Sequence, residues 1–203
     1  MGKVLIATVW KHEPIMKNIV EYDIEKLILV HEEKKLAKEE HWGQKKESIE
    51  TIESSLSDVI ELEKVETGLN DLYRVAKDVY EKIGSEERQI IVNITGGRKM
   101  QAIGTLLAAS KTENVEEALY WSEEDSNGDD KKHVPRFNLI ISDKEKKVIK
   151  SVENLSKSTD IVESLDMSQS MVYSHLKDLR RKGFLEKDDN LWKLTDLGRF
   201  MAH

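Results

Sequence analysis

Through the first two thirds of the chain, short apolar runs alternate with longer segments whose apolar residues recur every three or four positions. The short runs are rich in β-branched residues and have the length of strands, whereas the longer segments have the periodicity of amphipathic helices. Repeated β-α units with short connections predict the α/β class, with a Rossmann-like, mostly parallel and doubly wound sheet. The predicted strands are Val4–Val9, Leu27–Val30, Val59–Val65 and Gln89–Ile94.

Helix signals fill the intervals between these strands. Pro14 is expected to open a helix, because proline is favoured in a first helical turn. Thr67 is predicted to cap a later helix, which has one apolar face and ends at Gly84. The charged segment Glu32–Lys46 is predicted to be a loop entering a solvated helix. The helix Arg98–Ser110 is apolar almost all round, which predicts that it is packed inside.

The sheet is predicted to finish in an antiparallel ribbon formed by Leu119–Trp121 and Phe137–Ile141. The acidic segment Glu123–Lys132 between them is interpreted as a long hairpin excursion. Its carboxylates suggest a metal site, but the Ser-Asn-Gly sequence among them is typical of a hairpin tip, so we favour a solvated loop and expect no metal. These carboxylates are Glu123, Glu124, Asp125, Asp129 and Asp130.

The most informative chemistry follows the fourth predicted strand, where Thr95-Gly-Gly-Arg-Lys leads into a helix. Gly96 and Gly97 permit positive φ angles and let a ligand approach the backbone closely. The N–H groups at the start of the helix attract negative charge, and Arg98 and Lys99 add formal charge there. The chain has no G-x-x-x-x-G-K-[ST], and no G-x-G-x-x-G follows its first strand. The turn therefore predicts a nucleotide-like anion held in a less common way, with a merely tight connection as the alternative.

The loop after the first strand is expected to meet this turn. Ligands of such sheets bind beyond the carboxyl ends of the strands, near the switch in strand order. Thr8 and Thr95 carry hydroxyls suited to phosphate or ribose, Trp10 could stack on a base, and Lys11 adds a cation. Two alternatives stay open, namely Trp10 as a plain core or interface aromatic and His12 as an ordinary surface histidine.

A second module is predicted to begin at the capping box Ser-Asp-Lys-Glu of residues 142–145. This divides the chain into domains 1–142 and 143–203. After the capped helix, we expect helices over Asp160–Leu165 and Gln169–Lys182, and then a two-stranded wing that turns at residues 188–190. This order is that of a winged helix-turn-helix.

The third helix of this module has the face that would read DNA. Val172, Leu176 and Leu179 form its inward stripe, which leaves small polar and basic residues facing outward. Use of the module for protein contacts alone is the alternative. The candidate DNA-contacting residues of the helix and wing are Ser168, Gln169, Ser170, Tyr173, Ser174, Lys177, Arg181, Lys187 and Lys193.

Composition restricts the class of protein. The 203 residues are 38% hydrophobic and 35% charged, and the absence of cysteine excludes disulfides and cysteine-based zinc sites. The absence of a long apolar run or a signal peptide leads us to expect a cytoplasmic protein with no membrane partner. Residues 1–143 carry 20 Lys+Arg against 29 Asp+Glu, net −9, and residues 144–203 carry 12 against 10, net +2. This split favours nucleic acid as a partner of the second module only.

Taken together, these features resemble the CRISPR-associated Rossmann-fold (CARF) regulators of the archaeal Csa type, in which a CARF domain precedes a winged helix-turn-helix. The resemblance rests on Val4-Leu-Ile-Ala-Thr-Val-Trp, on Asn93-Ile-Thr-Gly-Gly-Arg-Lys-Met and on the domain order, so it spans nearly the whole chain. It implies a homodimer of antiviral defence whose paired turns bind a cyclic oligoadenylate across the two-fold axis, most often the four-membered ring, with no further cofactor. The implied ligand-binding residues are Thr8, Asn93, Thr95, Gly96, Gly97, Arg98 and Lys99.

The resemblance further implies a transcriptional regulator that binds double-stranded promoter DNA under control of this ligand. Two alternatives stay open. One is a ring nuclease that cleaves the ligand slowly, with Lys99 stabilising developing charge and His12 as the only nearby general base. The other is an adaptor of a CRISPR effector complex.

Overall fold

The structure is a computed structural model, and it describes residues 2–36, 39–122, 130–135, 139 and 141–202. The chain forms two compact units, Met1–Asn138 and Leu139–His203, and each is described by itself. The domain boundary expected between residues 142 and 143 lies four residues beyond this division.

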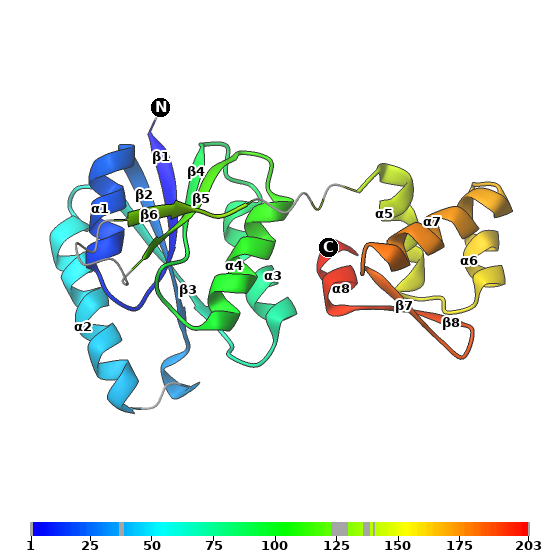
Figure 1. Cartoon of the computed structure of the whole chain (residues 1–203), viewed down its shortest axis with the longest axis horizontal. Coiled ribbons are helices and arrows are strands. Elements are labelled where there is room, and N and C mark those ends of the chain that lie inside the picture. Colours follow the sequence, from blue (N-terminus) through cyan, green and yellow to red (C-terminus); the bar gives the residue numbers. More distant parts are fainter. Residues whose placement is uncertain (1, 37–38, 123–129, 136–138, 140, 203) are drawn as a thin grey trace. The chain divides into compact units, whose positions relative to one another are not determined.

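The first unit is built on a sheet with the strand order β3-β2-β1-β4-β5-β6 (Figure 1). The first five of these strands run parallel to one another, and β6 is antiparallel to β5. The predicted α/β class with a mostly parallel sheet is thereby confirmed. The strands are β1 (Lys3–Thr8), β2 (Ile24–Glu32), β3 (Glu61–Thr67), β4 (Ile90–Asn93), β5 (Val115–Ser122) and β6 (Asp130–His133).

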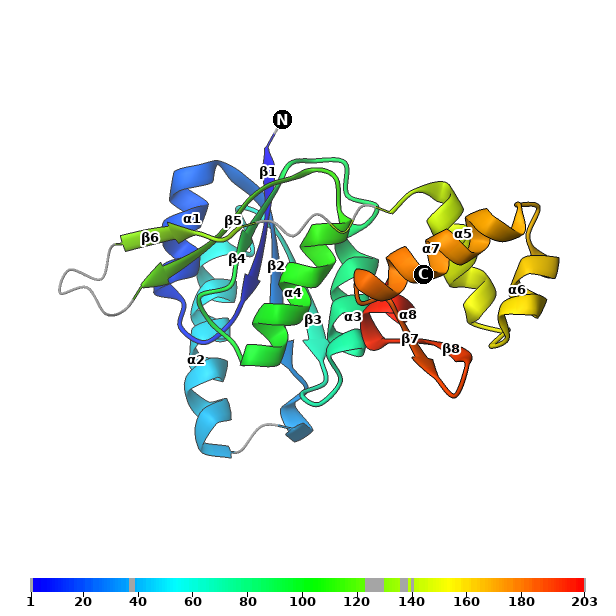
Figure 2. The ribbon, with the colours of Figure 1, turned by 45° about the vertical axis from the view of Figure 1, so that its right-hand side comes forward.

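Helices cover both faces of this sheet, with α1 and α2 on one side and α3 and α4 on the other (Figures 1 and 2). Leu5, Leu27 and Leu29 face α1 and α2, where they join a core with Ile15 and Ile52. No helix in the described ranges has the length and apolarity needed to cross a bilayer. The helices of this unit are α1 (Glu13–Tyr22), the 3-10 turn η1 (Lys34–Leu36), α2 (Glu39–Leu56), α3 (Leu72–Ile83) and α4 (Lys99–Lys111).

The helix α4 is buried on one face only. Gly104 lies against α3 so closely that a Cβ there would stand 2.4 Å from Val75 Cγ1. On the opposite face Ile103 is 47% exposed, and Met100 and Leu107 are half-buried. The prediction that this helix is packed inside is therefore wrong, because its apolar residues exceed what α3 and the sheet cover. Met100, Ile103 and Leu107, at positions i, i+3 and i+7, are called the α4 stripe below.

The cap of α3 also differs from the prediction. Thr67 is the last residue of β3 and is buried, so it cannot begin the helix. Asp71 takes the role instead, because its Oδ1 accepts a hydrogen bond of 3.1 Å from the backbone N of Arg74. Gly84 follows the last helical residue, as predicted.

The segment predicted as a loop and solvated helix, Glu32–Lys46, contains two fully buried charges. β2 continues through Glu32, and α2 begins at Glu39. Lys45 shares an inward stripe with Ile49, Ile52 and Leu56, all of which are buried. The prediction of a solvent-exposed helix is therefore wrong for these four residues, because this face of α2 packs on the sheet.

The antiparallel ribbon is present, but its second strand comes earlier than predicted. β6 pairs Asp130–His133 with Leu119–Ser122. Of the strand predicted over Phe137–Ile141, Leu139 and Ile141 are described and neither is in a strand, while 137, 138 and 140 lie outside the described residues. Glu123, Glu124, Asp125 and Asp129 lie outside them as well.

The two edge strands are β3 and β6. β3 exposes Glu61, Lys64 and Glu66. β6 consists of four polar residues, Asp-Lys-Lys-His. Both open edges of the sheet are thus charged.

The second unit is a helix-turn-helix followed by a two-stranded wing, as predicted. Ser142 and Glu145 form the expected capping box. Gly183 adopts φ +81° where α7 ends, and Asp189 and Asn190, at φ +44° and +67°, form the two-residue turn of the wing. The elements are α5 (Asp143–Val152), α6 (Ser158–Ser164), α7 (Gln169–Arg181), β7 (Leu185–Asp188), β8 (Leu191–Leu194) and an unpredicted α8 (Asp196–Ala202).

Candidate functional site

The carboxyl ends of β1 and β4 form the switch point of the sheet. These strands are neighbours, with Ala7 opposite Asn93. From β1 the chain builds outward through β2 to β3, and from β4 it builds outward the other way through β5. The loops that follow Thr8 and Asn93 lead to α1 and α4 on opposite faces of the sheet (Figure 1), and ligands of doubly wound sheets bind in the crevice at such a switch point.

The glycine turn after β4 presses against the loop after β1. A Cβ on Gly96 would lie 2.5 Å from Thr8 O and 2.6 Å from the backbone N of Trp10. Gly97 has φ +76°, and a Cβ there would lie 2.9 Å from Thr8 Cβ. Thr8 Oγ1 donates a hydrogen bond of 2.6 Å to Gly96 O. Close backbone packing and a left-handed conformation thus require glycine at both positions.

Asn93 and Thr95 brace the turn from within. Asn93 Oδ1 accepts hydrogen bonds from the backbone N of Thr95 at 2.8 Å and from Thr95 Oγ1 at 2.6 Å. Thr95 Oγ1 in turn accepts from the backbone N of Trp121 at 2.9 Å, and Asn93 Nδ2 donates to Asn18 Oδ1. The hydroxyl protons of Thr8 and Thr95, expected to face phosphate or ribose, are donated within the chain. These side chains shape the turn in this structure.

Arg98 and Lys99 bring positive charge to the start of α4. The backbone N of Arg98 donates a hydrogen bond of 2.8 Å to Gln101 Oε1. The Arg98 side chain is 37% exposed, and its Nε lies 3.7 Å from Glu32 Oε1. Lys99 is exposed. Two cations and the positive end of the helix dipole therefore meet at the switch point, where they favour an anion.

Behind Arg98 lies a buried polar cluster that the sequence interpretation missed. Lys45 Nζ forms an ion pair with Glu32 Oε2, and both side chains are fully buried. Gln101 Nε2 lies 3.5 Å from the same oxygen and donates to Thr67 Oγ1 at 3.2 Å. The signal available was the spacing of Lys45 four and seven residues before Ile49 and Ile52, which places it on the inward face of α2.

Burial and pairing act oppositely on these two charges. Burial favours a raised pKa for the Glu32 carboxyl, but the hydrogen bond from Lys45 and the Arg98 charge outweigh it, so the pKa lies below its usual range. Burial lowers the pKa of the Lys45 ammonium, and Glu32 opposes this shift. We treat the pair as ionised, because each charge has its counter-ion in contact.

The loop after β1 contributes an aromatic ring. Trp10 is half-buried, and Lys45 Nζ lies 5.5 Å from the centre of its ring. Lys11 is exposed beside it. His12 directly precedes α1 and lies 3.9 Å from Glu13. The structure thus brings Trp10 and Lys11 to the crevice with the turn.

The enclosed cavity at this crevice is small, about 10 Å³, which is the space of about one water molecule. This space is too small to hold a nucleotide. The residues that line the cavity are Thr8, Trp10, Lys11, Pro14, Ile15, Asn93, Thr95 and Gly96.

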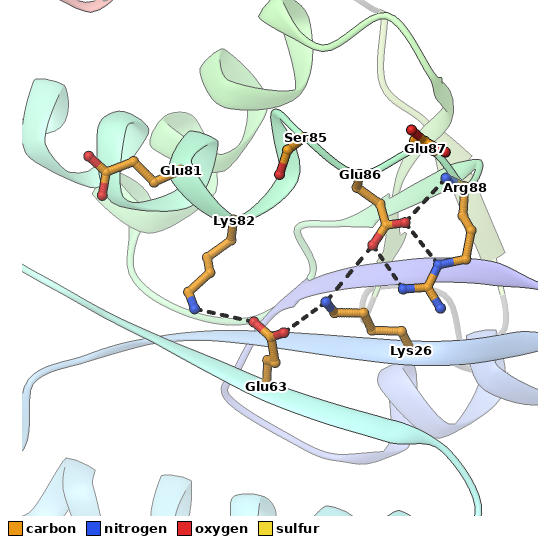
Figure 3. Close-up of a pocket in the computed structure, with 8 residues that line it drawn as sticks. All are labelled: Lys26, Glu63, Glu81, Lys82, Ser85, Glu86, Glu87 and Arg88. Carbon is orange, nitrogen blue, oxygen red and sulfur yellow. Dashed lines mark hydrogen bonds and ion pairs between the residues drawn. The ribbon is translucent and has the colours of Figure 1, made fainter.

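A larger cleft of about 460 Å³ opens near the amino ends of β2 and β3 (Figure 3). Lys26 lies 2.8 Å from Glu63 and 3.2 Å from Glu61, and Glu86 accepts hydrogen bonds from Arg88. As Figure 3 shows, Lys82, Glu63, Lys26, Glu86 and Arg88 point toward one another, whereas Glu81 and Glu87 point away. The charged groups of this cleft are thus paired with one another, as in an ion network that stabilises the fold.

Metal ligands do not gather in the described part of the chain, where no group of three His, Asp or Glu side chains is placed to hold an ion. Asp130, the one described carboxylate of the acidic segment, lies in β6 and pairs with Lys132.

The candidate DNA face of the second unit is polar and exposed. Val172, Leu176 and Leu179 are fully buried, as predicted. Ser168 caps α7 by accepting a hydrogen bond from the backbone N of Met171. Tyr173 is half-buried. The remaining candidates are exposed, namely Ser168, Gln169, Ser170, Ser174, Lys177, Arg181, Lys187 and Lys193.

Arg181 and Lys193 form ion pairs with carboxylates of the same unit. Arg181 lies 3.1 Å from Asp178, and Lys193 lies 2.6 Å from Asp188 across the wing. Such exposed pairs are weak, so a phosphate can replace the carboxylate. The helix and the wing therefore both expose basic groups, and α7 exposes small polar groups as well.

Comparison with known proteins matches both units. Residues 3–126, more than half of the chain, match a family model described as "HFX_2341_N:-like, N-terminal". Residues 152–187 match a model described as "Bacterial regulatory protein, arsR family". No curated protein matches.

Solved structures include 22 matching chains. One is Can2 from Sulfobacillus thermosulfidooxidans in complex with cyclic tetra-adenylate, with a TM-score of 0.47 and 11% sequence identity. The match covers 98% of this chain and 63% of that one, so this chain spans less than two thirds of the length of its relative.

Proposed function

The chain belongs to the family described as "HFX_2341_N:-like, N-terminal", and from this premise we propose that it is a DNA-binding transcriptional regulator controlled by a cyclic oligoadenylate, specifically cyclic tetra-adenylate. Residues 1–142 form the CARF domain, which binds the ligand and dimerises, and residues 143–203 bind promoter DNA. One observation carries the proposal: a cationic glycine turn at the switch point of a Rossmann-like sheet is joined in one chain to a winged helix-turn-helix.

The ligand half of the proposal rests on charge and shape at the turn. A cyclic oligoadenylate presents a ring of phosphates with outward bases, which suits Arg98, Lys99 and the start of α4. The half-buried Trp10 supplies a stacking surface beside them. Since the enclosed cavity holds about one water, the ring must span an open surface.

A second copy of the chain completes such a site. The α4 stripe begins one residue after Lys99 and leaves Ile103 47% exposed. An apolar stripe that continues directly from the candidate site is where two turns would be brought together across a two-fold axis. Ile103→Glu is accordingly expected to convert a dimer to monomers in sedimentation velocity, and an unchanged dimer would place the interface elsewhere.

The DNA half rests on α7 and the wing. A recognition helix lies in the major groove with polar and basic side chains toward bases and phosphates. The exposed face of α7 has this composition, and the arsR-type match covers the same segment. A dimer would present two such helices to a palindromic site.

The decisive experiment measures both affinities and their coupling. Binding of labelled cyclic tetra-adenylate is followed by fluorescence anisotropy, and operator DNA is selected from a random pool. If the ligand regulates DNA binding, saturating ligand changes DNA affinity, typically by about 5–150-fold, and DNA changes ligand affinity by the same factor. Equal affinities would refute regulation, and chromatography of the same samples would detect cleavage to linear products.

The contribution of the turn is tested by Arg98→Ala with Lys99→Ala. Loss of charged contacts is expected to weaken ligand binding by about 1.5–3 kcal/mol per contact. Lys77→Ala on α3 makes the same kind of charge change outside the turn and serves as the control. If the double variant binds like the control, the turn is only structural.

A further inference from the structure

Glu32 lies between two cations, and only one of them reaches the surface. Its Oε2 pairs with Lys45, and its Oε1 lies 3.7 Å from Arg98 Nε. Glu32 and Lys45 are fully buried, whereas Arg98 is 37% exposed. Any ligand at the surface can therefore touch Arg98 but neither member of the buried pair.

The second contact is an incomplete one. Glu32 Oε1 and Arg98 Nε are both buried and both lack a hydrogen-bond partner among the described residues. At 3.7 Å they attract each other as charges, but they are too far apart for a hydrogen bond. Gln101 links the two residues, because its Oε1 accepts a hydrogen bond of 2.8 Å from the backbone N of Arg98 and its Nε2 lies 3.5 Å from Glu32 Oε2.

The charges of Lys45 and Glu32 determine how much of the positive charge of Arg98 is available to a ligand. A lone carboxylate behind Arg98 would neutralise it and draw it away from a ligand. With Lys45 satisfying that carboxylate, the three groups carry a net charge of +1, and the accessible share of it lies on Arg98. In a buried setting, charges this close influence one another strongly, because water screens them little.

We propose that Lys45 is a positioning residue of the anion site, which neutralises Glu32 from behind and so leaves Arg98 available to the ligand. The inference rests on the proposed function, and it extends the site to a pair of residues that no ligand contacts. Glu32 and Gln101 hold Arg98 in place. Because Lys45 neutralises Glu32, this carboxylate does not compete with the ligand for the Arg98 guanidinium.

The test is a mutant cycle on the full chain, with labelled cyclic tetra-adenylate as the probe. Lys45→Met keeps an unbranched side chain, one atom shorter, and removes its charge. It is expected to weaken ligand binding about tenfold to a hundredfold, and to do so only when Arg98 is present. In an Arg98→Ala background the same change is expected to alter affinity less than about threefold. Equal losses in both backgrounds would overturn the proposal.

A second variant removes both buried charges. Glu32→Gln with Lys45→Met leaves no unpaired charge in the interior, so it is expected to fold even if Lys45→Met alone does not. Its ligand affinity should lie within about threefold of the parent, because Arg98 keeps its charge. A loss of about tenfold or more in a folded double variant would show that the pair is needed for another reason.

A ligand-free measurement separates this inference from the proposed function. The Nε–H signal of Arg98, assigned with Arg98→Lys, reports its contact with Glu32 by NMR. Its hydrogen exchange should slow at least about tenfold in Lys45→Met and quicken at least about tenfold in the double variant. Unchanged exchange in the double variant would overturn the inference even if the parent binds ligand. A parent that binds no cyclic oligoadenylate but shows these changes would overturn only the proposed function.

Discussion

Replacing Gly96 with alanine tests how tightly the two loops of the switch point are joined. The new methyl group would lie 2.5 Å from Thr8 O and 2.6 Å from the backbone N of Trp10. Both are main-chain atoms, so no side-chain rotation can relieve the contact. The loop after β1 must retreat by about 0.9 Å to reach an ordinary contact of 3.4 Å.

The magnitude follows from two costs. Overpacking of this kind typically costs about 1–3 kcal/mol. The retreat also stretches the 2.6 Å hydrogen bond from Thr8 Oγ1 to Gly96 O, worth about 1 kcal/mol. We therefore expect Gly96→Ala to lower the free energy of unfolding of the first unit by about 2–4 kcal/mol.

Urea unfolding followed by tryptophan fluorescence measures this change, because Trp10, Trp42 and Trp121 lie in the first unit and only Trp192 in the second. Gly43→Ala is the matched control. Gly43 lies within α2, and apart from its own helical turn no described atom stands within 4 Å of the place that a Cβ there would occupy, so alanine should stabilise by about 0.5–1 kcal/mol. If Gly96→Ala is as stable as the parent, the loops are not packed as described.

Three further outcomes are expected. Lys177→Ala should weaken DNA binding across sequences and reduce the slope of log affinity against log salt by about one unit, and an unchanged slope would assign the winged helix to protein contacts. The pKa of Glu86 is lowered from 4.5 to about 2, mainly by hydrogen bonds from Arg88. The ionised carboxylate therefore contributes fully to the free energy of unfolding above pH 4.5, and this contribution is lost as pH falls toward 2. Glu86→Gln should therefore cost about 2–3 kcal/mol at pH 7 and nothing below about pH 2 in urea titrations. Gly104→Ala should destabilise the contact with Val75 by about 1–3 kcal/mol in the same assay, and a neutral result would mean that α3 and α4 separate freely.

The parallel strands and the turn could be predicted because their signals are local. Val4–Val9 and Gln89–Ile94 are β-branched runs, and glycine at 96 and 97 breaks the chain between strand and helix. The winged unit was equally clear, since its capping box and the apolar stripe of α7 specify their elements directly.

Other features depend on contacts that no local pattern contains. β6 is a polar four-residue strand that exists because β5 offers it hydrogen bonds. Lys45 is buried because Glu32, thirteen residues earlier, supplies its counter-ion. Burial of a lysine is so unfavourable without a partner that sequence alone favours the solvated interpretation.

Arg98 and Lys99 could be identified from the sequence as the cations of the turn, but the buried groups that contact Arg98 could not. Arg98 could be predicted from the motif, but the carboxylate behind it could not, because Glu32 belongs to another strand. The hydroxyl of Thr95 looks available for a ligand in the sequence, whereas in the structure Asn93 and Trp121 use it.

The charged edge strands restrict how copies of this protein can assemble. An uncharged edge invites another strand to add to it, and a sheet with two such edges can grow into a filament. Glu61, Lys64 and Glu66 on β3, and the brevity of β6, disfavour that growth at both ends. The dimer that we propose would instead join helical surfaces, where a two-fold contact uses the same patch on both copies and stops at two. The charged edges therefore disfavour an open polymer of sheets and are compatible with the closed pair that we propose.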